Sequence, residues 1–330
     1  MTEPEFEVTG IGNALVDVIS SVDHAFIDAH GFPHGATTMV DLDRVEEVYD
    51  DLPPAQELSG GSCANTIAGL ASFGASVAFI GRVRDDQLGK VYTHDLRSLG
   101  VHFDVPPATD GPATGRCLVM VTDDAQRTQC TYLGASTFIG PEDVDPAVVA
   151  RAQVTYLEGY LWDQPPAKDA IRRAAAAARD AGRLVALTLS DPFCVERHRA
   201  EFRTLVERDI DVLFANEAEI CSLYEVDEFD AALQQVRRQC QIAALTRSEK
   251  GSVVVAGDEL HVVDAHPVGR VVDTTGAGDQ YAAGFLHGLT RGHDLATCGR
   301  LGSLAAAEVI SHFGARPAVS LAQLAETIVR

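Results

Sequence analysis

The chain has 330 residues, and its 26 Lys and Arg against 48 Asp and Glu give a formal net charge of −22. A hydrophobic fraction of 46% is enough for a large core, which excludes a disordered, collagen-like or low-complexity chain. The acidity, together with the lack of any basic run longer than two residues, argues against a nucleic-acid-binding surface, because a phosphate backbone requires clustered Lys and Arg.

The N-terminal part of the chain mixes short apolar runs with one helical stripe. The runs predict strands over 6–13, 16–22, 37–40 and 77–80. Apolar residues at helical spacing from Ile67 predict a helix that ends at Gly74, after a turn at 59–62. A further helix is expected to end at Gly100.

The remainder of the chain separates into a hairpin and an alternating region. Two β runs around a polar turn predict a hairpin over 116–133, with no helix beside it. Strands and helices then alternate over 154–157, 169–181, 184–189, 212–215, 242–246, the hairpin 252–263, 280–291 and 301–309. The alternation predicts a mostly parallel sheet covered on both faces. Two insertions, about 15–48 and 102–133, have only strand patterns and predict a small projecting sheet that acts as a lid.

The spread of the cysteines and the lack of a secretory signal indicate a reducing compartment. The N-terminal residues lack the positive and apolar regions of a secretory signal, and no apolar run approaches the about 18 residues of a transmembrane helix. Seven cysteines are spread along the chain without a C-x-x-C pair, as is typical of free thiols. These features predict a cytoplasmic protein without a membrane partner.

The sharpest motif is the heptad Asp273-Thr274-Thr275-Gly276-Ala277-Gly278-Asp279, directly before the helix predicted over 280–291. Small residues at a helix N-terminus present unpaired N–H groups and the positive end of the helix dipole, which together form an anion cradle. Asp279 stands beside this cradle, where a carboxylate can accept a proton from an attacking hydroxyl. For a bare Gly-Ala-Gly the alternative interpretation is a turn that only caps the helix.

This heptad resembles the C-terminal signature of the ribokinase (PfkB) family of carbohydrate and nucleoside kinases, and Gly60-Gly61-Ser62-Cys63-Ala64-Asn65-Thr66 looks like the family's N-terminal signature. The resemblance covers essentially the whole chain, so it implies a single kinase domain over 1–330. It also implies a ribokinase-like α/β fold: a doubly wound, mostly parallel sheet with helices on both faces and a small β-sheet lid.

The resemblance assigns roles around the heptad. Asp279 matches the catalytic base, and Gly276, Ala277 and Gly278 match the anion hole for the transferring phosphoryl group. Asn216 and Glu219 match the family's N-x-x-E motif, which organises Mg²⁺ through water. Taken alone, Asn216 is an ordinary helix N-cap.

The same resemblance suggests where ATP binds. Thr246 and Gly251 match the nucleotide motif T-x-G-x-x-G, in which Ser248 replaces the usual glycine. Residues 263–268 and 306–312 match segments that enclose adenine. The implied ATP-binding residues are Asn216, Thr246, Gly251, Thr275, Gly278 and His312. A monovalent-cation site for K⁺ or Na⁺ is matched by Asp273, Thr275, Val309, His312 and Gly314. Considered alone, His312 is a structural residue or a neighbour of the adenine.

The acceptor is suggested by the segment 12–17, which looks like the family's substrate motif. Asp17 would accept hydrogen bonds from two vicinal hydroxyls of a pentose. Four features of the sequence resemble adenosine kinases. They are the 12–17 motif, the 189–193 segment whose Phe would stack on the base, the lid turn at 126–128, and an apolar Met over the purine. Trp162 either lines this pocket or packs in the core. The implied substrate-binding residues are Asn13, Leu15, Asp17, Met39, Gly60, Gly61, Asn65, Arg127 and Phe193.

The sequence therefore predicts an ATP- and Mg²⁺-dependent kinase, monomeric or homodimeric, that phosphorylates the 5′-hydroxyl of a ribonucleoside and converts adenosine to AMP. The generic form of residues 60–65 keeps a sugar kinase for ribose, fructose or a related carbohydrate as the alternative. A Rossmann oxidoreductase is disfavoured because Leu15 stands where the third glycine of its fingerprint belongs. A non-catalytic interaction protein of the same fold would be expected to lose Asp279 or the Gly-Ala-Gly.

Overall fold

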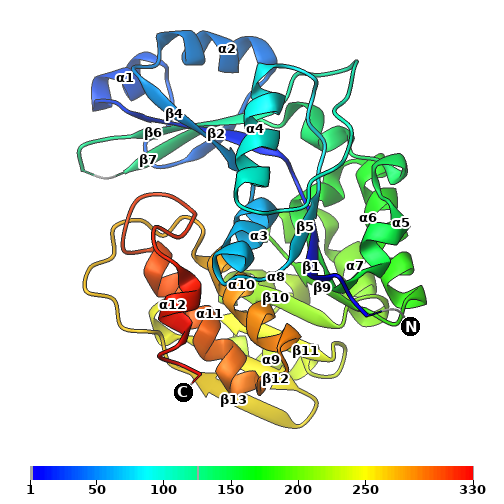
Figure 1. The fold of residues 1–330 in the computed structure, drawn as a ribbon. Coiled ribbons are helices and arrows are strands. Elements are labelled where there is room, and N and C mark those ends of the chain that lie inside the picture. Colours follow the sequence, from blue (N-terminus) through cyan, green and yellow to red (C-terminus); the bar gives the residue numbers. More distant parts are fainter. Residues whose placement is uncertain (1–2, 125, 330) are drawn as a thin grey trace.

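Two β-sheets of unequal size organise this computed structural model, which describes residues 3–124 and 126–329 (Figure 1). The large sheet contains β1 (Phe6–Ile11), β5 (Val77–Ile80), β8 (Ala152–Glu158), β9 (Leu184–Thr188), β10 (Val212–Asn216), β11 (Ile242–Thr246), β12 (Ser252–Ala256) and β13 (Glu259–Val263). Its order is β13-β12-β11-β10-β9-β8-β1-β5. Pairing is parallel from β5 to β11 and antiparallel for β12 and β13, so the predicted mostly parallel sheet is confirmed.

Helices cover both faces of the large sheet because its strands are apolar on both sides. Along β10, Val212 and Phe214 join one buried cluster, whereas Leu213 and Ala215 join another. The first face carries α3 (Ser62–Ser72), α4 (Gln87–Ser98), α10 (Ala277–Thr290), α11 (Leu295–Val309) and α12 (Leu321–Ala325). The second carries α5 (Pro146–Ala150), α6 (Pro165–Asp180), α7 (Pro192–Arg208), α8 (Glu217–Tyr224) and α9 (Phe229–Val236). Among the described residues, no helix combines the length and apolarity needed to cross a membrane.

The small sheet projects from the large one, with α1 and α2 along its far side (Figure 1). It has the order β3-β7-β6-β2-β4, and mixed pairing joins its strands. Its elements are β2 (Leu15–Ser21), α1 (His24–Ala29), β3 (Thr37–Met39), α2 (Leu42–Asp51), β4 (Ala55–Gly60), β6 (Gly115–Val121) and β7 (Arg127–Tyr132). Short 3₁₀ helices complete the chain at Gly134–Phe138, Pro141–Asp143, Gly159–Asp163 and Ser248–Lys250.

Three details differ from the sequence-based expectations. The insertion at 15–48 is not purely β, because Asp23 and Asp41 accept backbone N–H groups and begin α1 and α2. In place of the turn expected at 59–62, β4 runs to Gly60 and pairs antiparallel with β2, and α3 begins at Ser62. The helix expected from residue 280 begins at Ala277, since Gly276 adopts a left-handed φ of 76° and caps it.

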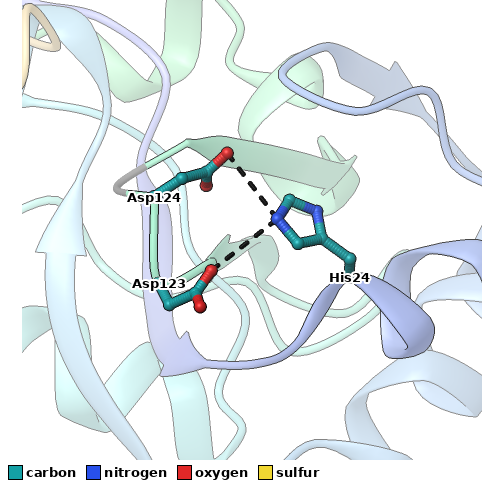
Figure 2. A group of neighbouring side chains, drawn as sticks. All are labelled: His24, Asp123 and Asp124. Atoms are coloured by element: carbon teal, nitrogen blue, oxygen red, sulfur yellow. Dashed lines mark ion pairs between the residues drawn. The ribbon is translucent and has the colours of Figure 1, made fainter.

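At an exposed corner of the small sheet, a histidine of α1 contacts two aspartates of the β6–β7 turn (Figure 2). His24, at the start of α1, has its Nε2 atom 3.7 Å from a carboxylate oxygen of Asp123 and 3.6 Å from one of Asp124. These aspartates follow β6, so the contacts link α1 to the β6–β7 turn. Exposed ion pairs contribute little to stability, and this one requires a protonated imidazole.

Glycine permits α10 and α11 to pack closely, and this closeness can be tested. A Cβ at Gly284 would lie 2.3 Å from the carbonyl oxygen of Leu301. Gly→Ala in a free helix gains about 1 kcal/mol, but a clash with backbone costs about 1–3 kcal/mol. We expect Gly284→Ala to lower the free energy of unfolding, measured by urea titration. Gly269→Ala is the control, because a Cβ there meets no described atom within 4 Å; an equal effect of both variants would contradict the packing argument.

Candidate active site

Several predicted site residues lie at the carboxyl ends of the parallel strands. β1 leads into Asn13, β8 ends at Glu158, β10 ends at Asn216, and β11 ends at Thr246. In open α/β sheets, ligands bind outside this edge. The chain also passes from the large sheet to the small one here, between β1 and β2, so both sheets border the same region.

Asn13 is held by a buried carboxyl group. Its backbone N–H and its Nδ2 both donate to Glu158, at 3.3 and 2.7 Å, and the N–H of Cys63 donates to the same carboxylate at 2.9 Å. Burial raises the pKa of Glu158 to about 7. Gly61 has a φ of 100°, and a Cβ there would lie 2.1 Å from the Asn13 carbonyl oxygen. Glu158 carries no motif in the sequence, so its part in fixing Asn13 is visible only in the fold.

Asp17 lies in β2, beside the space that a glycine leaves open. A Cβ at Gly60 would lie 2.3 Å from the Asp17 carboxyl carbon, so only glycine fits opposite this carboxylate. Burial raises the pKa of Asp17 to about 6. The guanidinium groups of Arg316 and Arg127 oppose that rise, whereas the charge of Asp279 adds to it. The charge of Asp279 therefore acts on the ionisation of Asp17.

Asp279 occupies the first turn of α10 and is fixed by two side chains of α3. The hydroxyl of Ser62 donates to its Oδ1 at 2.6 Å, and the Nδ2 of Asn65 donates to its Oδ2 at 3.3 Å. Burial raises the pKa of Asp279 to about 6, while both hydrogen bonds oppose the rise. Ser62 stands in the N-terminal signature, but the sequence assigned it no role of its own; its contact with Asp279, 217 residues away, is visible only in the fold.

The loop before α10 has the form of an anion cradle. A Cβ at Gly276 would lie 2.7 Å from the Cα of Ala315, whereas a Cβ at Gly278 would meet no described atom within 4 Å. The first position thus needs glycine for packing, and the second keeps the helix N-terminus open to a ligand. Ala277 is the first residue of α10, between these two glycines.

Asp273 stabilises that loop through hydrogen bonds of its carboxylate. Its carboxylate accepts the N–H groups of Thr275 and Gly314, each at 3.0 Å. The Nη2 of Arg127, from β7 of the small sheet, lies 2.6 Å from the same carboxylate, and both side chains are less than a tenth exposed. The Arg127 guanidinium also lies over the ring of Phe313. Arg127 therefore links the small sheet to the loop of the anion cradle.

Asn216 and Glu219 form a capping box at the start of α8. Glu219 N donates to the Asn216 side chain, and both the backbone N–H and the Nδ2 of Asn216 donate back to the Glu219 carboxylate. Burial raises the pKa of Glu219 to about 7, and the nearby charges of Asp191 and Asp279 add to the rise. The side chains of Asn216 and Glu219 thus satisfy each other, with Glu219 buried at the start of α8.

The predicted nucleotide loop follows β11. A Cβ at Gly251 would lie 2.0 Å from the Val263 carbonyl oxygen, and its φ is 79°. Ser248 has a left-handed φ of 52°, which explains the preference for glycine at this position. A pocket beside β13 is lined by 263–267 and by Ala296, Arg300 and Ser303 of α11. This pocket includes most of the first segment predicted to enclose adenine, 263–268, but no residue of the second segment, 306–312.

The remaining predicted residues differ in exposure. The side chains of Met39 and Phe193 are 60% and 73% exposed, so neither is a core residue. Trp162 is buried and its Nε1 donates to Glu201, which settles its role as core packing. Leu15 and Val309 are buried. His312 is bonded through Nε2 to Glu308, at 3.1 Å.

A family model described as pfkB family carbohydrate kinase matches residues 20–321 of the chain. The adenosine kinase of Saccharomyces cerevisiae is 27% identical over 326 residues, which cover 92% of this chain and 94% of that protein.

Two solved structures resemble the chain over almost its full length. The adenosine kinase of Sinorhizobium meliloti is 51% identical with a TM-score of 0.90, and the match covers 98% of this chain and 99% of that one. A probable sugar kinase protein from Rhizobium etli CFN 42 is 46% identical with a TM-score of 0.91, and 98% of each chain is covered. The ribokinase-like fold expected from the sequence is thereby confirmed.

Proposed function

We propose that this kinase, which belongs to the pfkB family of carbohydrate kinases, transfers the γ-phosphoryl group of ATP to the 5′-hydroxyl of a ribonucleoside, with adenosine as the preferred acceptor. The observation that carries the proposal is the placement of two carboxylates beside one short segment: Asp17 lies against Gly60, and Ser62, two residues further on, donates to Asp279 at the anion cradle. Asp279 is placed to receive a proton from the 5′-hydroxyl and Asp17 to bind the ribose diol.

The residues present fit ATP with a divalent cation. The open cradle at Gly276, Ala277 and Gly278 would receive the transferring phosphoryl group, and the loop from Thr246 to Gly251 would hold the nucleotide. Water bound between Glu219, Asn216 and the phosphates would hold Mg²⁺. When bound, the metal neutralises charge on the phosphate oxygens. A monovalent cation would be held by backbone carbonyls near Thr275, because the Asp273 carboxylate already accepts two N–H groups and faces Arg127.

In the proposed reaction, Asp279 accepts the 5′-hydroxyl proton as the oxygen attacks the γ-phosphorus. The new bond joins the 5′-oxygen to phosphorus, and the bond from phosphorus to the oxygen it shares with the β-phosphate breaks, so that AMP and ADP form. The N–H groups of the cradle hold the developing charge. The small sheet, linked to the cradle through Arg127 and Asp273, would exclude water as a competing acceptor.

A purine acceptor is supported by the exposed apolar side chains of Phe193 and Met39, and by the 51% identity to the adenosine kinase structure. An exposed aromatic ring can stack on a base. A sugar acceptor is the second candidate, favoured by the generic form of residues 60–65 and by the likeness to the probable sugar kinase protein.

The test is an ADP-release assay with Mg-ATP and a panel of adenosine, inosine, ribose and fructose, with K⁺ present. Adenosine preferred over free sugars, with AMP identified as product, supports the proposal. Turnover restricted to a free sugar would overturn the nucleoside assignment and leave a sugar kinase. No turnover with any acceptor would overturn both candidates.

The pKa of Asp279 predicts how turnover depends on pH. The proton acceptor must be ionised, and its pKa lies at about 6. With saturating substrates, we therefore expect kcat to rise about tenfold between pH 5 and pH 7 and to level off above. A kcat that stays flat or falls over this range would contradict the assignment of Asp279 as the base. Circular dichroism at each pH controls for unfolding.

A further inference from the structure

A second arginine, Arg316, connects the small sheet to the catalytic region, and it belongs to none of the motifs discussed above. It follows α11 in the loop that leads to α12, and its side chain is 17% exposed. Its guanidinium donates to Asp95 of α4 at 3.1 Å, to the hydroxyl of Ser59 in β4 at 2.8 Å, and to Asn65 of α3 at 3.4 Å. One side chain thus joins the loop after α11 to β4, α3 and α4, all of which lie more than 200 residues earlier in the chain.

The contact with Asn65 determines which way that amide points. A guanidinium group can only donate, so the Asn65 oxygen must face Arg316. The Nδ2 group at the other end of the amide then faces Asp279, to which it donates at 3.3 Å. Arg316 therefore acts on the proposed base through one intervening side chain.

The neighbour of Arg316 in the chain supports the anion cradle directly. Ala315 packs against Gly276, where a Cβ would lie 2.7 Å from the Ala315 Cα. The Nε2 of Gln280 donates to the carbonyl oxygens of both Ala315 and Asn65, each at 2.9 Å. A shift of Arg316 would accordingly move the wall of the cradle as well as the Asn65 amide.

On the small-sheet side, Arg316 binds next to the point where β4 joins α3. Asp95, its ion-pair partner, also accepts the N–H and the hydroxyl of Ser59, at 2.8 and 2.5 Å. Ser59 immediately precedes Gly60, the residue that leaves room for Asp17. This network fixes the end of β4 beside the proposed diol-binding carboxylate.

Arg316 also acts on Asp17 by charge. The ionisable groups that influence Asp17 are Arg316 and Arg127, which favour its carboxylate form, and Asp279, which opposes it. The Cys117 thiol faces Asp17 from the neighbouring strand β6 and is neutral, because burial raises its pKa. Of the two cations, Arg316 has the larger effect on the pKa of Asp17.

We propose that Arg316 is a positioning residue of this kinase: it orients Asn65 toward Asp279 and holds the end of β4 so that Asp17 faces the acceptor. The inference rests on the proposed phosphoryl transfer, but it applies to a nucleoside or to a sugar acceptor alike. It assigns Arg316 no contact with the reacting atoms.

The test compares Arg316→Gln, Arg316→Lys and the matched control Arg173→Gln, whose arginine lies exposed on α6. For whichever acceptor the wild type phosphorylates, we expect Arg316→Gln to lower kcat/KM by about 10²-fold, because misplaced groups lose orientation. Loss of the Arg316 charge should also raise the pKa of Asp17. The fall in acceptor KM that accompanies ionisation of Asp17 should therefore occur at a higher pH than in the wild type. Arg316→Lys should restore that pH dependence without restoring kcat, because an ammonium keeps the charge but not the planar fork.

A merely structural role would reduce the amount of folded enzyme and leave the pH dependence of KM unchanged. If Arg316→Gln fails to fold by circular dichroism, Asp95→Asn replaces it, because that change weakens the anchor and retains the Arg316 charge. Kinetic constants within about twofold of Arg173→Gln at every pH would overturn the inference. Turnover only with a sugar, together with the expected loss in Arg316→Gln, would overturn the nucleoside assignment and support the role of Arg316.

Discussion

Asp279→Asn is expected to lower turnover by about 10²-fold or more while the chain still folds. The amide keeps the shape of the carboxyl group and can still accept from the Ser62 hydroxyl, so the first turn of α10 should remain in place. It cannot take up the proton of the attacking hydroxyl. The measurement is kcat with saturating Mg-ATP and acceptor, for purified wild type and variant.

The matched control for this change is Asp169→Asn, because Asp169 lies exposed on α6. A second check uses stability. The pKa of Asp279 is raised in the folded state, so its contribution to stability is fully present at low pH and is lost as pH rises through about 6. Asparagine removes that loss, so the unfolding midpoint of the variant relative to wild type should be higher at pH 8 than at pH 4. Turnover close to that of Asp169→Asn would remove Asp279 from the mechanism.

The sequence was sufficient for features that depend on local pattern. The strands of the large sheet are apolar runs between turns, and the cradle is a continuous heptad, so both could be predicted before the fold was known. The helix α2 has a local signal of its own: Asp41 at its N-cap, followed by the buried Val45 and Val48 at helical spacing. The short strand β4 has a weaker sequence signal, because its polar residues form a strand only by pairing with β2.

Residues that act through tertiary contacts could not be found in this way. Glu158 ends an ordinary buried strand, and its three N–H donors come from Asn13 and Cys63, at least 95 residues away. Arg316 lies 251 residues from Asn65 and 257 from Ser59. A single arginine in a loop is usually a surface residue, so only the folded chain distinguishes this one. The partners of Arg127 were hidden for the same reason, although the residue itself was singled out.

Asp17→Asn is expected to lower kcat/KM for adenosine by about 10²-fold, mainly through a higher KM. A carboxylate can accept from both ribose hydroxyls, whereas an amide offers one oxygen and turns an NH₂ group toward the other hydroxyl. The Asp17 carboxylate has its place here because residue 60 is glycine. The measurement is kcat/KM for adenosine and for 2′-deoxyadenosine, in wild type and variant, with the KM for ATP as an internal control.

The deoxynucleoside separates a lost diol contact from general damage to the site. If Asp17 binds the diol, wild type should prefer adenosine, and the preference should largely disappear in Asp17→Asn, because each hydrogen bond to a charged group contributes about 1.5–3 kcal/mol. The pKa of about 6 adds a pH signature, since wild-type KM for adenosine should worsen below pH 6 as the carboxylate is protonated, whereas the variant should show no such change. An undiminished preference for adenosine in the variant would show that another group binds the diol. Asp17 would then remain as a buried acid whose charge is balanced by Arg316 and Arg127.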